Sequence, residues 1–192
     1  MSAWITMRGD DDADANLRAA LDLARTPHGT VDNVMRVHSL RPATMRGHVA
    51  LYRAALHDDS NTLPAWLQEA LGSYVSMLND CAYSLANHWA NARHLMADDA
   101  RADAAEAALR ARRPERVFAG AELALLQYAE KLTLRPGRMT QVDVDALKRE
   151  GVGDAEILEA NQIIAYFNYV NRCLNGLGVT TDGDVVGYYA GG

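Results

Sequence analysis

Apolar residues recur every three or four positions along most of the chain, which is the period of an amphipathic α-helix. One run places Cys81, Leu85, His88, Ala92 and Leu95 in steps of four, three, four and three. No segment has the two-residue alternation of a half-buried strand. The pattern predicts an all-α fold of about eight or nine helices, near residues 16–26, 31–35, 42–56, 64–78, 81–96, 98–113, 115–133, 140–151 and 154–175.

Residues that favour helix ends place several of these boundaries. Pro42 and Pro64 suit the first turn of a helix, and Thr62 is a good N-cap for the helix that holds Pro64. Thr140 begins a capping box whose third helical residue is Asp143. The same reasoning makes Asp154 the predicted N-cap of the last long helix.

Length and composition then limit the classes of protein. A chain of 192 residues with 49% hydrophobic residues predicts one domain, residues 1–192, with a core at about 30–180 and a tail at 179–192. The net charge of −6 gives no electrostatic reason to bind nucleic acid or an anionic membrane. No apolar run approaches the ~20 residues of a membrane span. With no signal-peptide pattern and two cysteines, a cytoplasmic protein is expected.

Chemistry concentrates in residues 69–88. Cys81, Ser84 and His88 stand at positions i, i+3 and i+7, which share one face of an α-helix. Glu69 lies on the preceding predicted helix, and Asn79-Asp80 interrupts the pattern between the two. If the helices pair in antiparallel fashion, Glu69 meets the other three side chains. We therefore predict that these four residues form a mostly buried site on an antiparallel helix pair.

The same stretch resembles a known signature. Glu, eleven residues, Cys, two residues, Cys, three residues and His mark the alkylhydroperoxidase D (AhpD)-like, carboxymuconolactone decarboxylase-like superfamily. Glu69, Cys81 and His88 fall in register with it, whereas Ser84 occupies the place of the second cysteine. Residues 128–178 resemble the uncharacterised peroxidase-related branch of that superfamily. The resemblance extends over about residues 30–180 and implies an AhpD-like helical domain.

The resemblance also implies a chemistry. In the family, the second cysteine attacks a hydroperoxide, the first resolves the sulfenic acid to a disulfide, and Glu and His relay protons. Here Cys81 stands at the resolving position, and Ser84 cannot form a disulfide with it. Tyr83 stands where some relatives have a relay histidine. The predicted helix start at Cys81 favours a thiolate there.

Three functions stay open. The first is a peroxidase-related oxidoreductase that uses Cys81 as a single redox thiol, acts on an organic hydroperoxide and depends on an external thiol reductant. The second is a decarboxylase or isomerase acting on a small lactone, with Glu69 and His88 as its acid–base groups. The third is a non-catalytic helical oligomer that binds a small ligand or a partner and whose site has decayed.

The other cysteine, histidine and tail tyrosine residues give little indication of chemistry. Cys173 has no catalytic neighbour in the sequence, and the other histidines lack metal-ligand spacing, so neither a metal nor another cofactor is expected. Tyr188 and Tyr189 stand on a Gly-rich tail and need a surface to bury against. Together with the resemblance, they predict a homo-oligomer whose tail contacts a neighbouring subunit.

Overall fold

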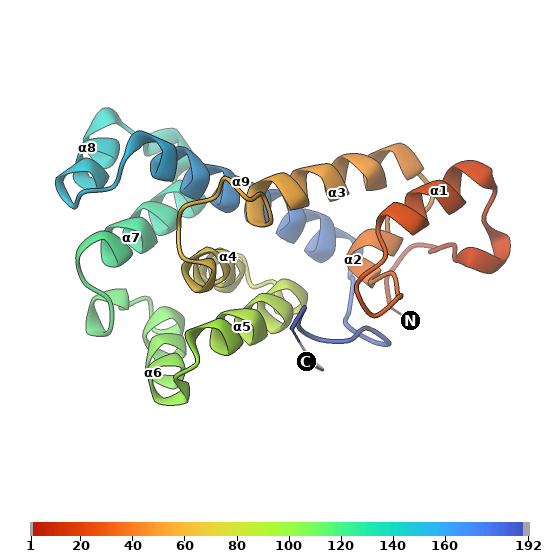
Figure 1. Ribbon diagram of the computed structural model, residues 1–192, viewed down its shortest axis with the longest axis horizontal. Coiled ribbons are helices and arrows are strands. Elements are labelled where there is room, and N and C mark those ends of the chain that lie inside the picture. The colour runs from red at the N-terminus through yellow and green to blue at the C-terminus, as the bar shows by residue number, and fades with distance from the viewer. Residues whose placement is uncertain (1, 190–192) are drawn as a thin grey trace.

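The computed structural model describes residues 2–189, which form nine α-helices and three short 3₁₀ turns without a strand (Figure 1). The all-α prediction is therefore confirmed. The helices are α1 (Ala15–Leu23), α2 (Asn33–Arg36), α3 (Pro42–Leu56), α4 (Ala65–Leu78), α5 (Ala82–Met96), α6 (Asp99–Arg110), α7 (Gly120–Leu134), α8 (Gln141–Arg149) and α9 (Asp154–Leu177).

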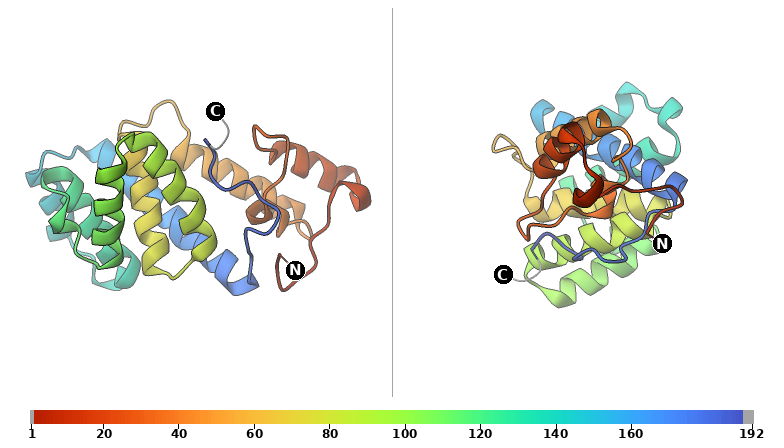
Figure 2. Two further views of the ribbon diagram at one scale, coloured as in Figure 1. Left: turned by 90° about the horizontal axis from the view of Figure 1, so that it is seen from below. Right: turned by 90° about the vertical axis from the view of Figure 1, so that its right-hand side faces the viewer.

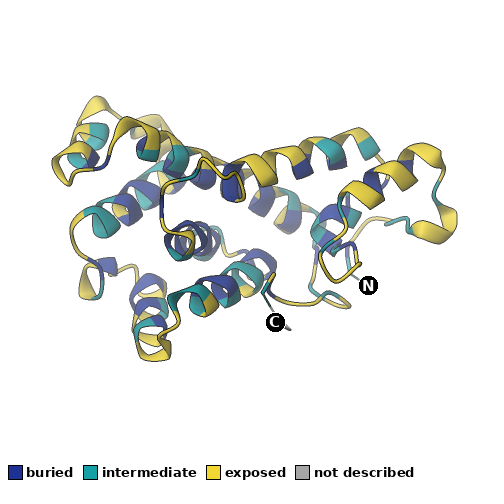
Figure 3. Ribbon diagram, viewed as in Figure 1, coloured by how far each residue is buried: buried dark blue, intermediate teal, exposed yellow. Residues whose placement is uncertain are grey.

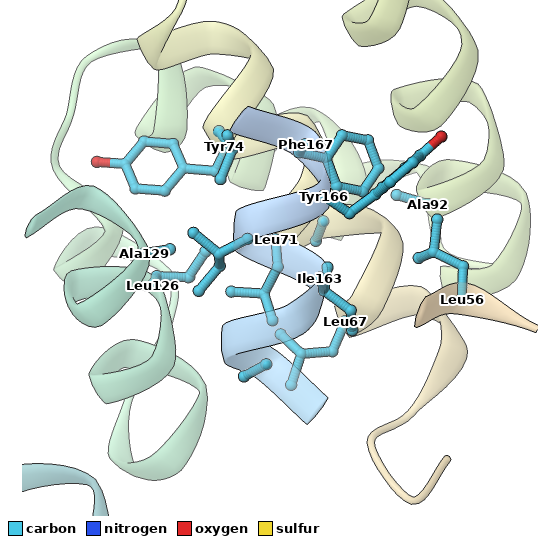
Figure 4. Close-up of a cluster of buried hydrophobic side chains, with 14 of the residues drawn as sticks. Leu56, Leu67, Leu71, Tyr74, Ala92, Leu126, Ala129, Ile163, Tyr166 and Phe167 are labelled. Atoms are coloured by element: carbon cyan, nitrogen blue, oxygen red, sulfur yellow. The ribbon is translucent and has the colours of Figure 1, made fainter. Parts of the chain in front are cut away.

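Helix α4 is the centre of the molecule. It packs against α5, α7 and α9, and it is seen end-on in the middle of Figure 1. Figure 3 shows it as the most continuously buried helix, because its residues from Leu67 to Ser76 are all buried. Leu71 and Tyr74 of α4 and Phe167 of α9 belong to one apolar cluster, which Figure 4 shows. The side chains of α4 are therefore held by neighbours on several sides.

A glycine sets the distance between α4 and α9. A Cβ atom at Gly72 would lie 2.2 Å from ring atoms of Phe167, well inside van der Waals contact. The absence of that atom lets the Phe167 ring lie directly on the α4 backbone. The same ring meets His88 edge-on, with ring centroids 4.5 Å apart. Gly72 thus helps to position the histidine of the predicted site.

Helices α1, α2 and α3 build a second, smaller core at the N-terminal end of the molecule. It is made by Leu17, Ala20, Leu21, Val31, Met35, Met45 and Val49. Helix α3 also packs against α9, which joins this core to the α4 bundle. One face of α3 is thereby directed toward α5 and α9.

Residues 179–189, which we call the strap, cross between α5 and the N-terminal core (Figure 2). The Asp184 carboxylate accepts the backbone N–H of Asn33 at 3.0 Å and the hydroxyl of Tyr83 at 2.5 Å. Tyr188 lies against His57, and Tyr189 stacks on His94, with ring centroids 5.4 and 5.2 Å apart. The two tyrosines therefore contact their own chain, and the predicted homo-oligomer rests on the resemblance alone.

Several helix ends differ from the prediction. Pro64, not Thr62, is the N-cap of α4, because Thr62 and Leu63 bind the Glu159 carboxylate instead. Gly153 caps α9, and its N–H donates to Glu156. The predicted Thr140–Asp143 contact is confirmed at 2.7 Å.

Other ends move by several residues. Helix α7 begins at Gly120 rather than near 115, because residues 114–116 form a 3₁₀ turn. Helix α9 continues to Leu177 and ends at Gly178, whose φ of 61° suits glycine. Among the helices within residues 2–189, none has the combined length and apolar character needed to cross a membrane.

Candidate functional site

The site begins at the turn between α4 and α5. Asp80 adopts a φ of +51°, a conformation that Asp tolerates better than most residues. The turn lets the Cys81 N–H donate to the Ser76 carbonyl at 2.9 Å, and Cys81 becomes the N-cap of α5. Helix α5 then runs back along α4, as the sequence predicted. This return places Glu69 of α4 beside His88 of α5.

Glu69 and His88 form a direct pair inside the molecule. The His88 Nδ1 lies 2.6 Å from Glu69 Oε2, and the two side chains are 13% and 5% exposed. The Asn91 amide donates to the other carboxylate oxygen, Oε1, at 3.2 Å. Because Nδ1 is held by the carboxylate, Nε2 is the ring nitrogen left for a ligand. The buried carboxylate also stabilises positive charge that forms on the ring when Nε2 takes a proton.

His88 faces a cavity of about 560 Å³, a volume that fits a small organic molecule. The cavity lies between α5, α3, α9, the α1–α2 connection and the strap. Aromatic, imidazole and amide side chains line its α5 and α9 walls, whereas charged side chains occur on the α1–α3 side. Its lining includes Arg25, Asp32, Val49, Tyr52, Arg53, His57, Ser84, Asn87, His88, Asn91, Tyr166, Val170, Val185, Gly187 and Tyr188.

The four predicted residues have different relations to this cavity. Ser84 and His88 line it, and Glu69 holds His88 without lining it. The Ser84 Oγ lies 2.9 Å from the Ser76 Oγ. Cys81 is buried but is not part of the lining. The helix pair thus places Ser84 and His88 on the cavity wall, with Glu69 behind His88, and leaves the thiol outside the lining.

The environment of Cys81 does not favour a thiolate. Burial raises the pKa of the Cys81 thiol, although a hydrogen bond from the Ser84 backbone N–H acts in the opposite direction. The sequence-based expectation of a thiolate at the helix start is therefore wrong. Desolvation in the core outweighs the effect of the helix N-terminus.

The strap closes one side of the cavity through two asparagines of α5. The Gly187 N–H donates to Asn87 Oδ1 at 3.1 Å, and the Tyr188 N–H donates to Asn91 Oδ1 at 2.7 Å. Asn91 thus binds the strap with its oxygen and Glu69 with its nitrogen. Sequence reasoning missed both asparagines, although each lies three residues after Ser84 or His88 and so on the same helix face.

Tyr83, which stands where some relatives have a relay histidine, makes a structural contact with the strap. Its hydroxyl donates to Asp184 of the strap and accepts the Val34 N–H at 3.2 Å. Within residues 2–189, no group of three His, Cys, Asp or Glu side chains is arranged to hold a metal ion. The polar side chains that α5 and α9 contribute to the cavity carry hydroxyls, amides and an imidazole, which can bind a ligand and exchange protons with it.

Comparison with known proteins gives structural matches only. No family model matches the chain, and no curated protein matches it. A peroxidase-related protein with an alkylhydroperoxidase AhpD core, from Ralstonia eutropha JMP134, superposes with a TM-score of 0.81 at 21% identity, over 96% of this chain and 94% of that one. A peroxidase-related protein from Silicibacter sp. TM1040 superposes with a TM-score of 0.79 at 19% identity, over 95% and 93% of the two chains.

A third similar structure has a different described activity. It is a Cys→Ala variant of the debrominase Bmp8 in complex with 2,3,4-tribromopyrrole. It superposes with a TM-score of 0.75 at 17% identity, over 95% of this chain and 94% of that chain. The present chain therefore has the AhpD-like fold that its sequence predicted, along nearly its whole length. Proteins that share this fold differ in what they are described to do.

Proposed function

We propose that this chain is an enzyme that binds a small organic molecule in its cavity and moves a proton with the Glu69–His88 pair. The observation that carries the proposal is the 2.6 Å contact that fixes Nδ1 of His88 while the ring lines the cavity. A histidine held by a buried carboxylate is a common general base or acid. Glu69 orients the ring, and Asn91 orients Glu69.

The cavity favours a small ring compound. Tyr52, Tyr166 and His57 line it with aromatic and imidazole rings, and Val49 and Val170 add apolar surface. The similar Bmp8 structure holds a small planar ring, tribromopyrrole, which supports a flat ligand for this chain too. His88 Nε2 would take a proton from such a molecule, or return one, in a decarboxylation or isomerisation of a small lactone or a related ring. The strap would limit the access of water to the site.

A second candidate is a peroxidase-type oxidoreductase. Its support is the likeness in fold to two peroxidase-related proteins and the register of Cys81 with the family signature. In this function the Cys81 thiolate attacks an organic hydroperoxide, releases an alcohol and becomes a sulfenic acid. Because Ser84 cannot resolve it, an external thiol must reduce the sulfenic acid. The raised pKa of Cys81 and its place outside the cavity lining make this candidate the weaker one.

One set of variants separates the two candidates. Wild type, Cys81→Ser and His88→Gln are assayed with small lactones, and with an organic hydroperoxide plus a dithiol. Acid–base function predicts lactone turnover that survives Cys81→Ser and falls by about 10²-fold or more in His88→Gln. The matched control is His57→Gln, since His57 lines the same cavity without a carboxylate contact. Hydroperoxide turnover that is lost in Cys81→Ser would favour the peroxidase instead.

A further inference from the structure

A second histidine lies behind another wall of the cavity. His48 of α3 is 1% exposed, and its Nε2 lies 3.0 Å from the hydroxyl of Tyr166 on α9. Its Nδ1 lies 3.0 Å from Nε2 of His38, whose Nδ1 lies 3.0 Å from the Thr44 hydroxyl. Tyr166 lines the cavity, and Thr44 is exposed. An unbroken row of hydrogen bonds therefore joins the cavity to the surface.

The last contact in the row fixes the direction of all the others. The Thr44 hydroxyl lies 2.8 Å from the Arg41 carbonyl oxygen, which has no proton, so the hydroxyl must donate there. The contact between Thr44 and His38 is then a hydrogen bond only if His38 Nδ1 donates. A neutral His38 consequently accepts at Nε2, which requires His48 to donate from Nδ1 and to accept at Nε2. Tyr166 must therefore donate its only proton to His48.

We propose that the Tyr166 oxygen accepts a hydrogen bond from an O–H or N–H group of a ligand in the cavity. Tyr166 then passes the ligand's proton to the surface through His48 and His38. This inference deepens the proposed function, on which it rests, because it names a property of the ligand. With its own proton committed to His48, the Tyr166 oxygen has only lone pairs to offer to a molecule in the cavity.

Proton transfer along the row balances without any further reactant. A ligand O–H or N–H gives its proton to the Tyr166 oxygen as Tyr166 gives its own to His48 Nε2. His48 then passes its Nδ1 proton to His38 Nε2, and His38 becomes an imidazolium. The half-buried His38 releases its Nδ1 proton to solvent water at the exposed Thr44 end. The ligand is left as an anion in the cavity that His88 lines, where the protonated form of His88 can return a proton elsewhere on the ring.

Burial agrees with the neutral resting state of the row. It lowers the pKa of His48 to about 3 and lowers the pKa of His38, so each ring is neutral at rest and carries a single proton. Burial also raises the pKa of Tyr166, which therefore takes a proton from the ligand only as it loses its own. Figure 4 shows Tyr166 beside Phe167 on α9, with its hydroxyl directed away from the apolar cluster. The row is therefore set apart from the core that packs around α4.

The first test measures the tautomers directly in the wild-type chain. Nitrogen-15 NMR of the imidazoles, assigned with His38→Asn, should show His48 and His38 neutral at pH 7, each protonated on Nδ1. A proton on Nε2 of His48 would overturn the proposal, because Tyr166 would then accept from His48 and direct its own proton elsewhere. This measurement needs no ligand and no turnover.

The second test measures ligand preference with 4-fluorophenol, which donates a hydrogen bond, and 4-fluoroanisole, which cannot. Fluorine NMR titration of wild type should give about ten-fold tighter binding of the phenol, the effect expected for one buried hydrogen bond. Tyr166→Phe should abolish this preference. The matched control is Tyr169→Phe, because the Tyr169 ring lies 5.5 Å from the His48 ring but outside the cavity lining.

The outcomes keep this proposal separate from the proposed function. Equal binding of the two probes by wild type, an unchanged preference in Tyr166→Phe, or no binding of either probe would overturn the role of Tyr166. His88→Gln should keep the preference for the phenol while it loses turnover. Turnover that is unaffected by His88→Gln would instead refute the acid–base function and leave the binding result standing.

Discussion

The α4–α5 pair and the strap meet at the same cavity, but they are held in opposite ways. Residues from Leu67 to Ser76 of α4 are all buried, and Glu69 lies among them. In the strap, Val185, Val186 and Tyr188 are 40–43% exposed. The helix pair is fixed by packing on several sides, whereas hydrogen bonds to Asn33, Tyr83 and two asparagines of α5 hold the strap.

This difference divides the site into a rigid part and a part that can open. Segments with few buried apolar contacts open at low cost in free energy, while core helices open only with the whole fold. The chemistry is placed on the core helices, where a buried carboxylate keeps its geometry. The cover is placed on the strap, where a ligand can enter. Asn91 joins the two, because it binds both Glu69 and Tyr188.

Removing the charge of Glu69 should have the largest effect on turnover. The change should act on the α4–α5 pair and leave the strap as it is. Glu69→Gln keeps the shape of the side chain and its contact with Asn91, so the fold and the strap should persist. Turnover of a compound that wild type converts should fall by about 10²-fold or more, because the ring loses the charge that stabilises its protonated form. Steady-state kinetics and thermal unfolding measure the two effects.

The matched control for Glu69→Gln is Asn87→Ala, which removes a strap contact and leaves the Glu69–His88 pair intact. We expect it to retain most of the turnover. Equal losses in the two variants would contradict the division of the site, since the strap would then contribute as much to catalysis as the carboxylate.

Adding a thiol at the cavity should give the α4–α5 pair peroxidase activity, the second candidate function. Ser84→Cys places a sulfur on the lining, one helical turn after Cys81, and a near-isosteric change of this kind costs about 1 kcal/mol or less. The thiolate introduced by this substitution would attack the hydroperoxide, and Cys81 would resolve the resulting sulfenic acid to a disulfide. Hydroperoxide consumption with a dithiol should therefore rise above that of wild type.

The double variant Ser84→Cys with Cys81→Ser tests the resolving role. It should consume less hydroperoxide than Ser84→Cys alone, because no second thiol is then close in sequence to form the disulfide. Three equal rates near background, in folded proteins, would show that the site lacks more than one thiol for peroxidase chemistry.

The same division explains what the sequence could predict. Helices α3 and α5 follow from local signals, namely Pro42 and the regular spacing from Cys81 onward. The meeting of Glu69 and His88 follows from two adjacent helices and a short turn. These features depend on residues close together in the chain, and local periodicity is sufficient to find them.

The strap and the His48–Tyr166 contact depend on partners far apart in the chain. Tyr83 and Asp184 are separated by 101 positions, and His48 and Tyr166 by 118. Their pairing is decided by how α3, α5 and α9 pack, which no short sequence pattern records. A Gly-rich stretch with two tyrosines gives the same local signal whether it covers its own chain or a neighbour.

Loosening the strap at its anchor should have a smaller effect than changing Glu69. Tyr83→Phe removes the hydroxyl that donates to Asp184, and a hydrogen bond to a charged group contributes about 1.5–3 kcal/mol. We expect faster proteolytic cleavage within residues 180–189 and a lower Tm. Tyr189→Phe is the control, because the Tyr189 ring stacks on His94 and should remain there. An uncleaved strap in Tyr83→Phe would show that packing, rather than this anchor, holds it.

The smallest predicted effect depends on pH and concerns Asp32, which precedes α2 near the strap. Burial, and then the charge of Asp184, raise the pKa of Asp32 to about 6 from an ordinary value of 3.8. The folded chain therefore holds this proton more tightly than the unfolded chain does. Stability that this proton provides is complete below about pH 4 and is lost as the pH rises through 6.

Asp32→Asn removes this pH dependence and keeps a residue suited to the N-cap position. At pH 8 the variant should be more stable than wild type by about 1 kcal/mol or less, since Asp32 is only half-buried, which corresponds to a Tm increase of about 2–4 °C at most. At pH 4 the two Tm values should agree. The control, Asp22→Asn on the exposed side of α1, should show no such difference. A variant that gains nothing at pH 8 would mean that solvent, or the nearby His28 and Arg36, already offsets the charge of Asp32.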